Sequence, residues 1–293
     1  MRLLSKQLIV SLLFGLTSFY ASSVLSGENQ VNEDAEFTQP IQLNDIDRSG
    51  GYLKLGFGYN IVTNPYNDEE SGMSLFINAR YQWESQVFVE AAFYRVLNSG
   101  INIGYNFYNT ERWNFDLVTN IAHGKNETGF IDQGKVFYKK SDITRMAALR
   151  STGSFDKTTV QFVVAPYSFN DEYDNALYAS VWIDQSFQVK NWELYTAFGL
   201  EYRSEDMLDY YYGIEADRAT NNFKAYHPSS GIDTTTELGA SYPINNKWLF
   251  ETYYRYTRLA DSITDSPIMQ FASTLESRSK NMTEFGILVS YVF

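Results

Sequence analysis

Residues 283–293, the last eleven of the chain, read T-E-F-G-I-L-V-S-Y-V-F and alternate in polarity with a period of two. One parity is wholly apolar and consists of Phe285, Ile287, Val289, Tyr291 and Phe293. The other parity is mixed and includes Glu284, Gly286 and Ser290. A period of two predicts a β-strand. A strand with one wholly apolar face at the end of the chain is typical of a β-barrel set in a bilayer.

Upstream stretches alternate in the same way, each with an apolar parity opposite a polar one. With the terminal strand they make twelve predicted strands, and ten or fourteen remain alternatives. They cover residues 53–59, 75–81, 87–93, 101–107, 115–121, 143–153, 160–164, 177–183, 194–200, 234–240, 248–256 and 283–293. The stretch at 143–153 has the weakest alternation.

Charge separates the two faces of these strands. Outside the stretch at 143–153, no Asp, Glu, Lys or Arg falls on an apolar parity. Such segregation is expected in a membrane, because an Arg or Lys that faces lipid at the bilayer midplane costs roughly 2–4 kcal/mol. The predicted lumen charges are Lys54, Arg80, Glu90, Glu201, Glu251 and Arg255. They would either pair and fill the lumen or line a narrow polar channel, and the sequence favours neither.

The connections between strands alternate in length. Short turns are predicted near residues 84–85, 109–111, 155–156, 190–191 and 243–246, and long loops at 62–72, 123–142, 168–174, 204–231 and 258–282. A short connection near residues 98–99 breaks the pattern. Outer-membrane barrels have short periplasmic turns and long outer loops. The sequence therefore predicts an all-β, antiparallel transmembrane β-barrel of about twelve strands.

Composition agrees with a barrel and excludes other classes. Of 293 residues, 17% are aromatic, while 20% are charged and the net charge is −12. A chain this acidic is a poor nucleic-acid binder. With no cysteine, disulfides and thiolate metal sites are excluded.

The amino-terminal segment is predicted to be a secretory signal peptide. Arg2 and Lys6 precede a short apolar run at residues 8–16, which is too short for a membrane helix. Cleavage is expected before Gly27, with residues 21–23 as the second candidate site. The predicted organisation is a signal peptide at 1–26, a polar periplasmic tether at 27–50 and the barrel at 51–293.

Candidate chemical groups lie in the long loops. His123 and His227 could each pair with a serine, as in outer-membrane lipases, but no glycine-serine elbow surrounds either one. We interpret both as surface-loop histidines. Carboxylates gather at residues 68–70, 171–174 and 205–209 without the spacing of a dedicated calcium loop, so solvated acidic loops are favoured. We predict no catalytic residue, no cofactor and no metal.

Two loop segments carry a family resemblance. Residues 209–216 read D-Y-Y-Y-G-I-E-A, and L-A-D at 259–261 is followed by S-P-I at 266–268. In this order they resemble motifs of the MipA/OmpV outer-membrane family, the MltA-interacting proteins, over nearly the whole mature chain. The matching motif positions are Tyr211, Tyr212, Gly213, Asp261, Ser266 and Pro267. The terminal Tyr-x-Phe similarly resembles the signal read by the outer-membrane assembly machinery of Gram-negative bacteria.

The resemblance implies a barrel in the outer membrane, in contact with lipid and lipopolysaccharide and without catalysis of its own. It implies a scaffold that links a lytic transglycosylase to a peptidoglycan synthase in the cell wall. A small-solute pore, and a surface adhesin or osmotic-response antigen acting through the outer loops, are the alternatives. For the tyrosine-rich and Ser-Pro-Ile segments we favour an anchor that closes the barrel mouth over a gate or docking surface.

Overall fold

The computed structural model describes residues 48–65, 70–92, 100–132, 135–170, 175–274 and 279–293, and for 127–132 and 135–137 the backbone alone. The predicted signal peptide, and the predicted tether up to residue 47, lie outside these residues. Both assignments stay predictions.

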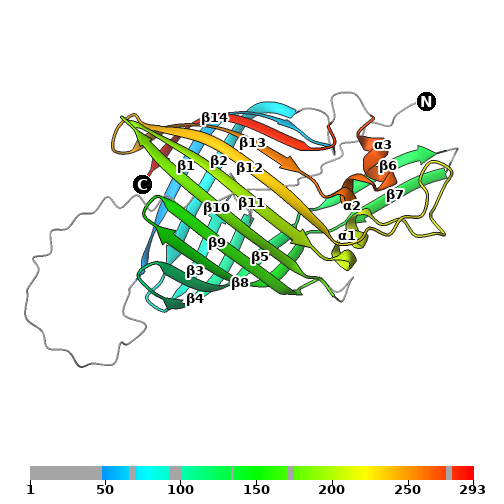
Figure 1. Ribbon diagram of the computed structural model, residues 1–293, viewed down its shortest axis with the longest axis horizontal. Coiled ribbons are helices and arrows are strands. Elements are labelled where there is room, and N and C mark those ends of the chain that lie inside the picture. The colour runs from blue at the N-terminus through cyan, green and yellow to red at the C-terminus, as the bar shows by residue number, and fades with distance from the viewer. Residues whose placement is uncertain (1–47, 66–69, 93–99, 133–134, 171–174, 275–278) are drawn as a thin grey trace, which may run out of the picture.

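Twelve strands form a closed antiparallel barrel in the order β1-β14-β13-β12-β11-β10-β9-β8-β5-β4-β3-β2 (Figure 1). The predicted fold class is confirmed, because each predicted strand coincides with one strand of the barrel. These are β1 (Gly50–Thr63), β2 (Glu70–Gln82), β3 (Val87–Ala92), β4 (Gly100–Asn109), β5 (Trp113–His123), β8 (Thr144–Phe155), β9 (Thr158–Ser168), β10 (Tyr178–Val189), β11 (Trp192–Arg203), β12 (Gly231–Pro243), β13 (Trp248–Arg258) and β14 (Met282–Val292).

Three of the predicted long loops contain regular structure. The stretch 123–142 holds a separate hairpin, β6 (Asn126–Asp132) and β7 (Lys135–Ser141). Helix α1 (Glu205–Tyr212) follows β11, while α2 (Asp261–Thr264) and α3 (Pro267–Ala272) follow β13. Hairpin and helices lie at the same end of the barrel, here called the loop end, and the opposite end is the turn end (Figure 1). Within the described residues, no helix has the length and apolar character to span a bilayer.

The terminal strand closes the barrel against the first strand. β14 pairs with β1 in a register that places Phe57 opposite Val289, and the Phe293 amide donates to the Leu53 carbonyl at 3.0 Å. The apolar face of β14 points outward, with Ile287 41% and Phe293 69% exposed. Such exposure of large apolar side chains suits contact with lipid.

An aromatic belt marks the turn end. Trp83 lies in the β2–β3 turn, and Trp113, Trp192 and Trp248 begin β5, β11 and β13. Neighbouring rings surround them, as where Trp248 meets Tyr291 edge-on at 5.0 Å. Aromatic girdles form at the interfaces of transmembrane barrels, so this belt places one membrane boundary at the turn end.

Inside the wall, aromatic rings lie against glycines of the neighbouring strand. In each pair the two residues are direct register partners, and a Cβ on the glycine would lie 2.2–2.3 Å from the ring. The pairs are Phe88–Gly104, Trp182–Gly199, Tyr195–Gly239 and Tyr253–Gly286. Glycine is needed because its missing side chain is the space that the ring fills.

We expect Gly286→Val to lower the free energy of unfolding by about 1–3 kcal/mol, the usual cost of overpacking. The valine would displace the Tyr253 ring, whose hydroxyl donates to Glu284. The urea midpoint of the refolded barrel measures the loss. Gly72→Val is the matched control, because a Cβ there meets nothing within 4 Å; equal midpoints for the two variants would contradict the packing argument.

Candidate functional site

The first group of lumen charges surrounds Arg150 on β8. Its Nη1 lies 2.8 Å from Oε1 of Glu90, and its Nη2 lies 2.8 Å from Oδ2 of Asp116. Arg80 approaches the same carboxylates at 3.5 and 3.7 Å and stacks its guanidinium 3.8 Å from the centroid of the Phe88 ring. Charges from four strands thus neutralise one another in the lumen.

The second group joins strands across and beside the barrel seam. Lys54 on β1 pairs with Glu251 on β13 at 2.9 Å, and the Ser290 hydroxyl of the intervening β14 donates to the same carboxylate at 2.6 Å. The barrel therefore closes at β1–β14 through side chains as well as through the backbone ladder.

The third group is centred on Arg255 of β13. Its Nε lies 2.8 Å from Glu237 of β12, and its Nη1 lies 3.1 Å from Glu284 of β14. The Tyr195 hydroxyl donates to Glu237 at 2.6 Å. The side chains of Arg255, Glu237 and Glu284 all lie on the inner parity of their strands.

The fourth group lies nearest the loop end and crosses the lumen. Arg203 on β11 pairs with Glu201 at 2.9 Å and with Asp233 of β12. Its Nε donates to the Ala122 carbonyl of β5 at 3.2 Å, although β5 and β11 are not neighbours in the barrel. The Tyr178 hydroxyl completes the group by donating to Glu201 at 3.3 Å.

All six predicted lumen charges have an ion-pair partner in the structure. They are Lys54, Arg80, Glu90, Glu201, Glu251 and Arg255. Of the two arrangements that the sequence left open, this geometry corresponds to pairing within the lumen. Sequence reasoning missed Arg203 and Arg150, each of which also binds two carboxylates.

Helix α1 caps the loop end. Ser204 is its N-cap residue, and Glu205 and Asp206 in the first turn suit the positive end of the helix dipole. Gly213 caps the carboxyl end of the helix, and its amide donates to the Asp209 carbonyl at 2.8 Å. Its fully buried side chains are Met207, Leu208, Tyr211 and Tyr212. These side chains pack with apolar residues of β5, β8, β9 and β10 in one continuous core.

The motif tyrosines bind a histidine of the barrel wall. The Tyr211 ring stacks on His123 with centroids 3.5 Å apart, and the Tyr212 hydroxyl lies 2.9 Å from His123 Nε2. The Tyr211 hydroxyl donates to the Asp142 carbonyl and lies 2.7 Å from Thr144 Oγ1. The interpretation of His123 as a surface residue was wrong, since it is 2% exposed. A register shift between Ile121 and His123 leaves it buried at the end of β5.

The two family motifs meet at one hydrogen bond. The Ser266 hydroxyl donates to the Tyr212 carbonyl at 2.9 Å, and Pro267 begins α3 at a position where proline costs no hydrogen bond. Asp261 does not join this contact; it lies on the surface, where it pairs with Arg258 at 3.3 Å.

Hairpin β6–β7 forms hydrogen bonds to the carboxyl end of α1. Lys139 Nζ donates to the carbonyls of Asp209 at 3.0 Å and Gly213 at 2.6 Å. Burial lowers the pKa of Lys139 to about 8, and the nearby Asp209 carboxylate opposes that shift. The Ser141 hydroxyl donates to the Tyr210 carbonyl at 3.0 Å. We call α1–α3 together with the segment 213–230, which joins α1 to β12, the plug.

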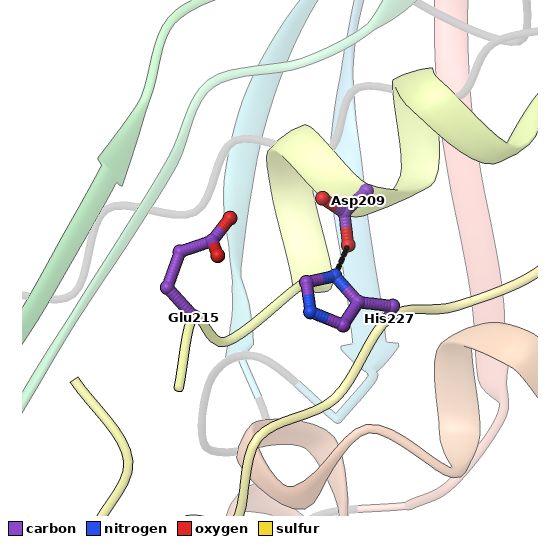
Figure 2. Close-up of side chains that lie close together, drawn as sticks. All are labelled: Asp209, Glu215 and His227. Atoms are coloured by element: carbon purple, nitrogen blue, oxygen red, sulfur yellow. Dashed lines mark hydrogen bonds and ion pairs between the residues drawn. The ribbon is translucent and has the colours of Figure 1, made fainter. Parts of the chain in front are cut away.

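One group on the plug has ligand atoms suited to a metal. Figure 2 shows the side chains of Asp209, Glu215 and His227, with His227 Nδ1 3.0 Å from Asp209 Oδ1. One ligand atom from each residue lies within 4.8 Å of the other two. His227 is exposed, as the sequence indicated. The sequence predicted no metal site, and its spacing does not group these residues, because Glu215 lies six positions after Asp209 and His227 twelve positions after Glu215.

The closed barrel, its apolar outer face and its polar, ion-paired lumen define an outer-membrane β-barrel protein. The family model for MltA-interacting protein MipA matches residues 55–293, and the chain belongs to this family.

Named relatives agree with this class. The MltA-interacting protein of Escherichia coli K12 is 25% identical over 233 residues, covering 76% of this chain and 86% of the relative. Outer membrane protein Omp26La of Vibrio anguillarum and OmpV of Vibrio cholerae are each 40% identical over 97 residues, 32% of this chain. The match spans only 34% of the length of each of these two. The chain is an outer-membrane protein, and the two Vibrio relatives are named as outer membrane proteins.

Solved barrels cover most of the chain at low similarity. OmpT of Vibrio cholerae aligns with 83% of this chain and 97% of its own, at 7% identity and a TM-score of 0.43. The NanC porin aligns with 82% and 98%, at 9% identity and a TM-score of 0.43.

Proposed function

We propose that this protein is a non-enzymatic scaffold that holds murein-remodelling enzymes at the inner face of the outer membrane. The partners would be a lytic transglycosylase of the MltA type and a peptidoglycan synthase. The name of the Escherichia coli relative supports this proposal, because that relative aligns over 86% of its length.

The observation that carries the proposal is the ion-paired interior of the barrel, covered by the plug at the loop end. Paired charges occupy the lumen in four groups, and the plug covers the loop end with four fully buried side chains of α1. A barrel built to conduct solutes needs an open polar path, whereas a scaffold needs a rigid wall. The interior described here suits the second requirement.

The turn end is the proposed docking face. With the plug outside the cell, the short turns would face the murein, and they present charges of both signs, including Glu84, Arg112, Lys190 and Lys247. Arg48 donates to the Thr110 carbonyl at 3.3 Å, so the end of the predicted tether meets the same face. A protein partner would therefore find tether and turns together.

We expect the Arg112→Glu/Lys247→Glu double variant to bind a transglycosylase of the MltA type at least about tenfold more weakly, a loss of about 1.4 kcal/mol. Where these basic residues face acidic groups of the partner, their reversal places like charges opposite each other. Surface-immobilised transglycosylase and detergent-solubilised barrel give the dissociation constants. Lys224→Glu on the plug is the matched control, and equal effects of the two variants would contradict the assignment of the docking face.

A narrow pore is the second candidate, because the wall also carries polar side chains without an ion-pair role. Asn120 is fully buried, and neither polar atom of its amide has a hydrogen-bond partner within the described residues. Single-channel recording of the purified barrel in a planar bilayer separates the two functions. A scaffold with a filled lumen gives no stepwise conductance, and reproducible steps would favour the pore.

A further inference from the structure

The group formed by Asp209, Glu215 and His227 is held by the backbone of the plug. Asp209 lies in the last turn of α1. Ile214 and Tyr226 form an antiparallel bridge and exchange backbone hydrogen bonds of 2.8 and 3.0 Å. Glu215 directly follows the first of these residues, and His227 directly follows the second. This bridge brings two segments twelve residues apart to the end of the helix, and Figure 2 shows the three side chains gathered there.

Gly213 leaves room for the Asp209 carboxylate. A Cβ at position 213 would lie 2.3 Å from Asp209 Oδ1, the atom that contacts His227. Lys139 fixes the same turn by binding the carbonyls of Asp209 and Gly213. Lys139 sets the position of the Asp209 backbone, and the Ile214–Tyr226 bridge sets that of Glu215, before any ligand arrives.

We propose that Asp209, Glu215 and His227 bind a divalent transition-metal ion of the zinc type on the plug. An imidazole nitrogen with two carboxylate oxygens suits zinc, whereas calcium and magnesium prefer oxygen ligands alone. Three protein ligands leave a fourth tetrahedral position open to water or to a group from outside. This inference is independent of the scaffold function.

To bind zinc, the three ligand atoms must move somewhat closer together. Zinc bonds of about 2.0–2.2 Å bring nitrogen and oxygen ligands closer together than the present limit of 4.8 Å. The side chain of His227 is 57% exposed and that of Asp209 32% exposed, so the ligands have space to rotate. The nearby ammonium of Lys139 opposes a cation, but the two carboxylates carry the larger charge. Once bound, the ion joins α1 to the segment after the bridge and holds the plug in place.

Zinc binding is tested on the full, refolded chain without a histidine tag, by competition with a chromophoric zinc chelator. We expect one equivalent of Zn²⁺ per chain. We expect His227→Ala and Glu215→Gln each to weaken zinc binding by at least about tenfold. Even mutation of residues that only hydrogen-bond to metal ligands typically lowers metal affinity by that much. The change in gel mobility on heating shows that each variant is folded.

Asp217→Asn is the matched control, because Asp217 is an exposed carboxylate two residues from Glu215 and outside the ligand group. It is expected to bind zinc like the unaltered chain. Equal weakening by Asp217→Asn and Glu215→Gln would show diffuse attraction and overturn the site. Displacement of zinc by equimolar calcium would overturn the assignment of metal class.

Discussion

Replacing Arg203 with methionine is expected to lower the free energy of unfolding of the barrel by about 3–5 kcal/mol, the cost of removing one partner from a buried ion pair. Arg203 is 1% exposed and sits between the carboxylates of Glu201 and Asp233. Without the guanidinium, two buried carboxylates would lose their counter-charge.

The position of Arg203 makes the loss larger than that of a single pair. Its Nε bond to Ala122 is a link across the lumen, because β5 and β11 share no edge. Asp233, its other partner, also accepts from the Ala260 amide at 2.7 Å, so the same group fastens the segment before α2. We therefore expect the plug and the wall to weaken together.

Urea unfolding of the refolded barrel, followed by tryptophan fluorescence, measures the change as a shift in midpoint. Arg258→Met is the matched control, since Arg258 also pairs with an aspartate, Asp261, but both side chains are more than half exposed. Exposed pairs contribute about 0–1 kcal/mol. Similar shifts for the two variants would mean that burial of the Arg203 group does not determine its contribution.

The twelve strands were predictable because lipid restricts the outer face of every strand. A wall that alternates between lipid and lumen leaves a period of two in the sequence, and Phe285 to Phe293 shows it most clearly. The inward position of Arg255 and Glu251 followed from parity alone. Which charges pair did not follow, because pairing depends on the register between strands, as where Glu237 lies opposite Arg255.

The plug was not predictable to the same degree. Three tyrosines at 210–212 favour a strand by propensity, yet they form the end of a helix because the barrel mouth buries Tyr211 and Tyr212. His123 was misplaced since alternation was followed only to residue 121, short of the register shift. The zinc-type group was missed because a backbone bridge, not sequence spacing, assembles it.

Replacing Tyr211 with alanine is expected to expose the plug to protease. The ring stacks on His123 at 3.5 Å, and its hydroxyl contacts Asp142 and Thr144. Loss of a buried aromatic side chain costs about 3–5 kcal/mol. If local opening of the plug carries that cost, the open population rises at least about 100-fold, since each 1.4 kcal/mol is tenfold.

Chymotrypsin cleavage after Tyr212 reports this opening, because Tyr212 is fully buried while the plug is closed. Cleavage tracks the open population when closing is faster than cutting. Arg218 is exposed, so trypsin cleavage after it measures how accessible the chain is to a protease in each sample. The chymotrypsin rate is compared with this trypsin rate. The measurement works on refolded barrel and on intact cells, where cleavage by added protease tests whether the plug lies outside.

Tyr211→Phe separates the ring from the hydroxyl. The phenylalanine keeps the stack on His123 but removes the hydroxyl that contacts the Asp142 carbonyl and the buried Thr144. Loss of a hydrogen bond at a buried group costs about 1–3 kcal/mol. We therefore expect its cleavage rate to fall between those of the unaltered chain and Tyr211→Ala. If Tyr211→Ala is cleaved after Tyr212 no faster than the unaltered chain, Tyr211 does not hold the plug. If Tyr211→Phe is cleaved as fast as Tyr211→Ala, the hydroxyl bonds rather than the stacked ring keep the mouth closed.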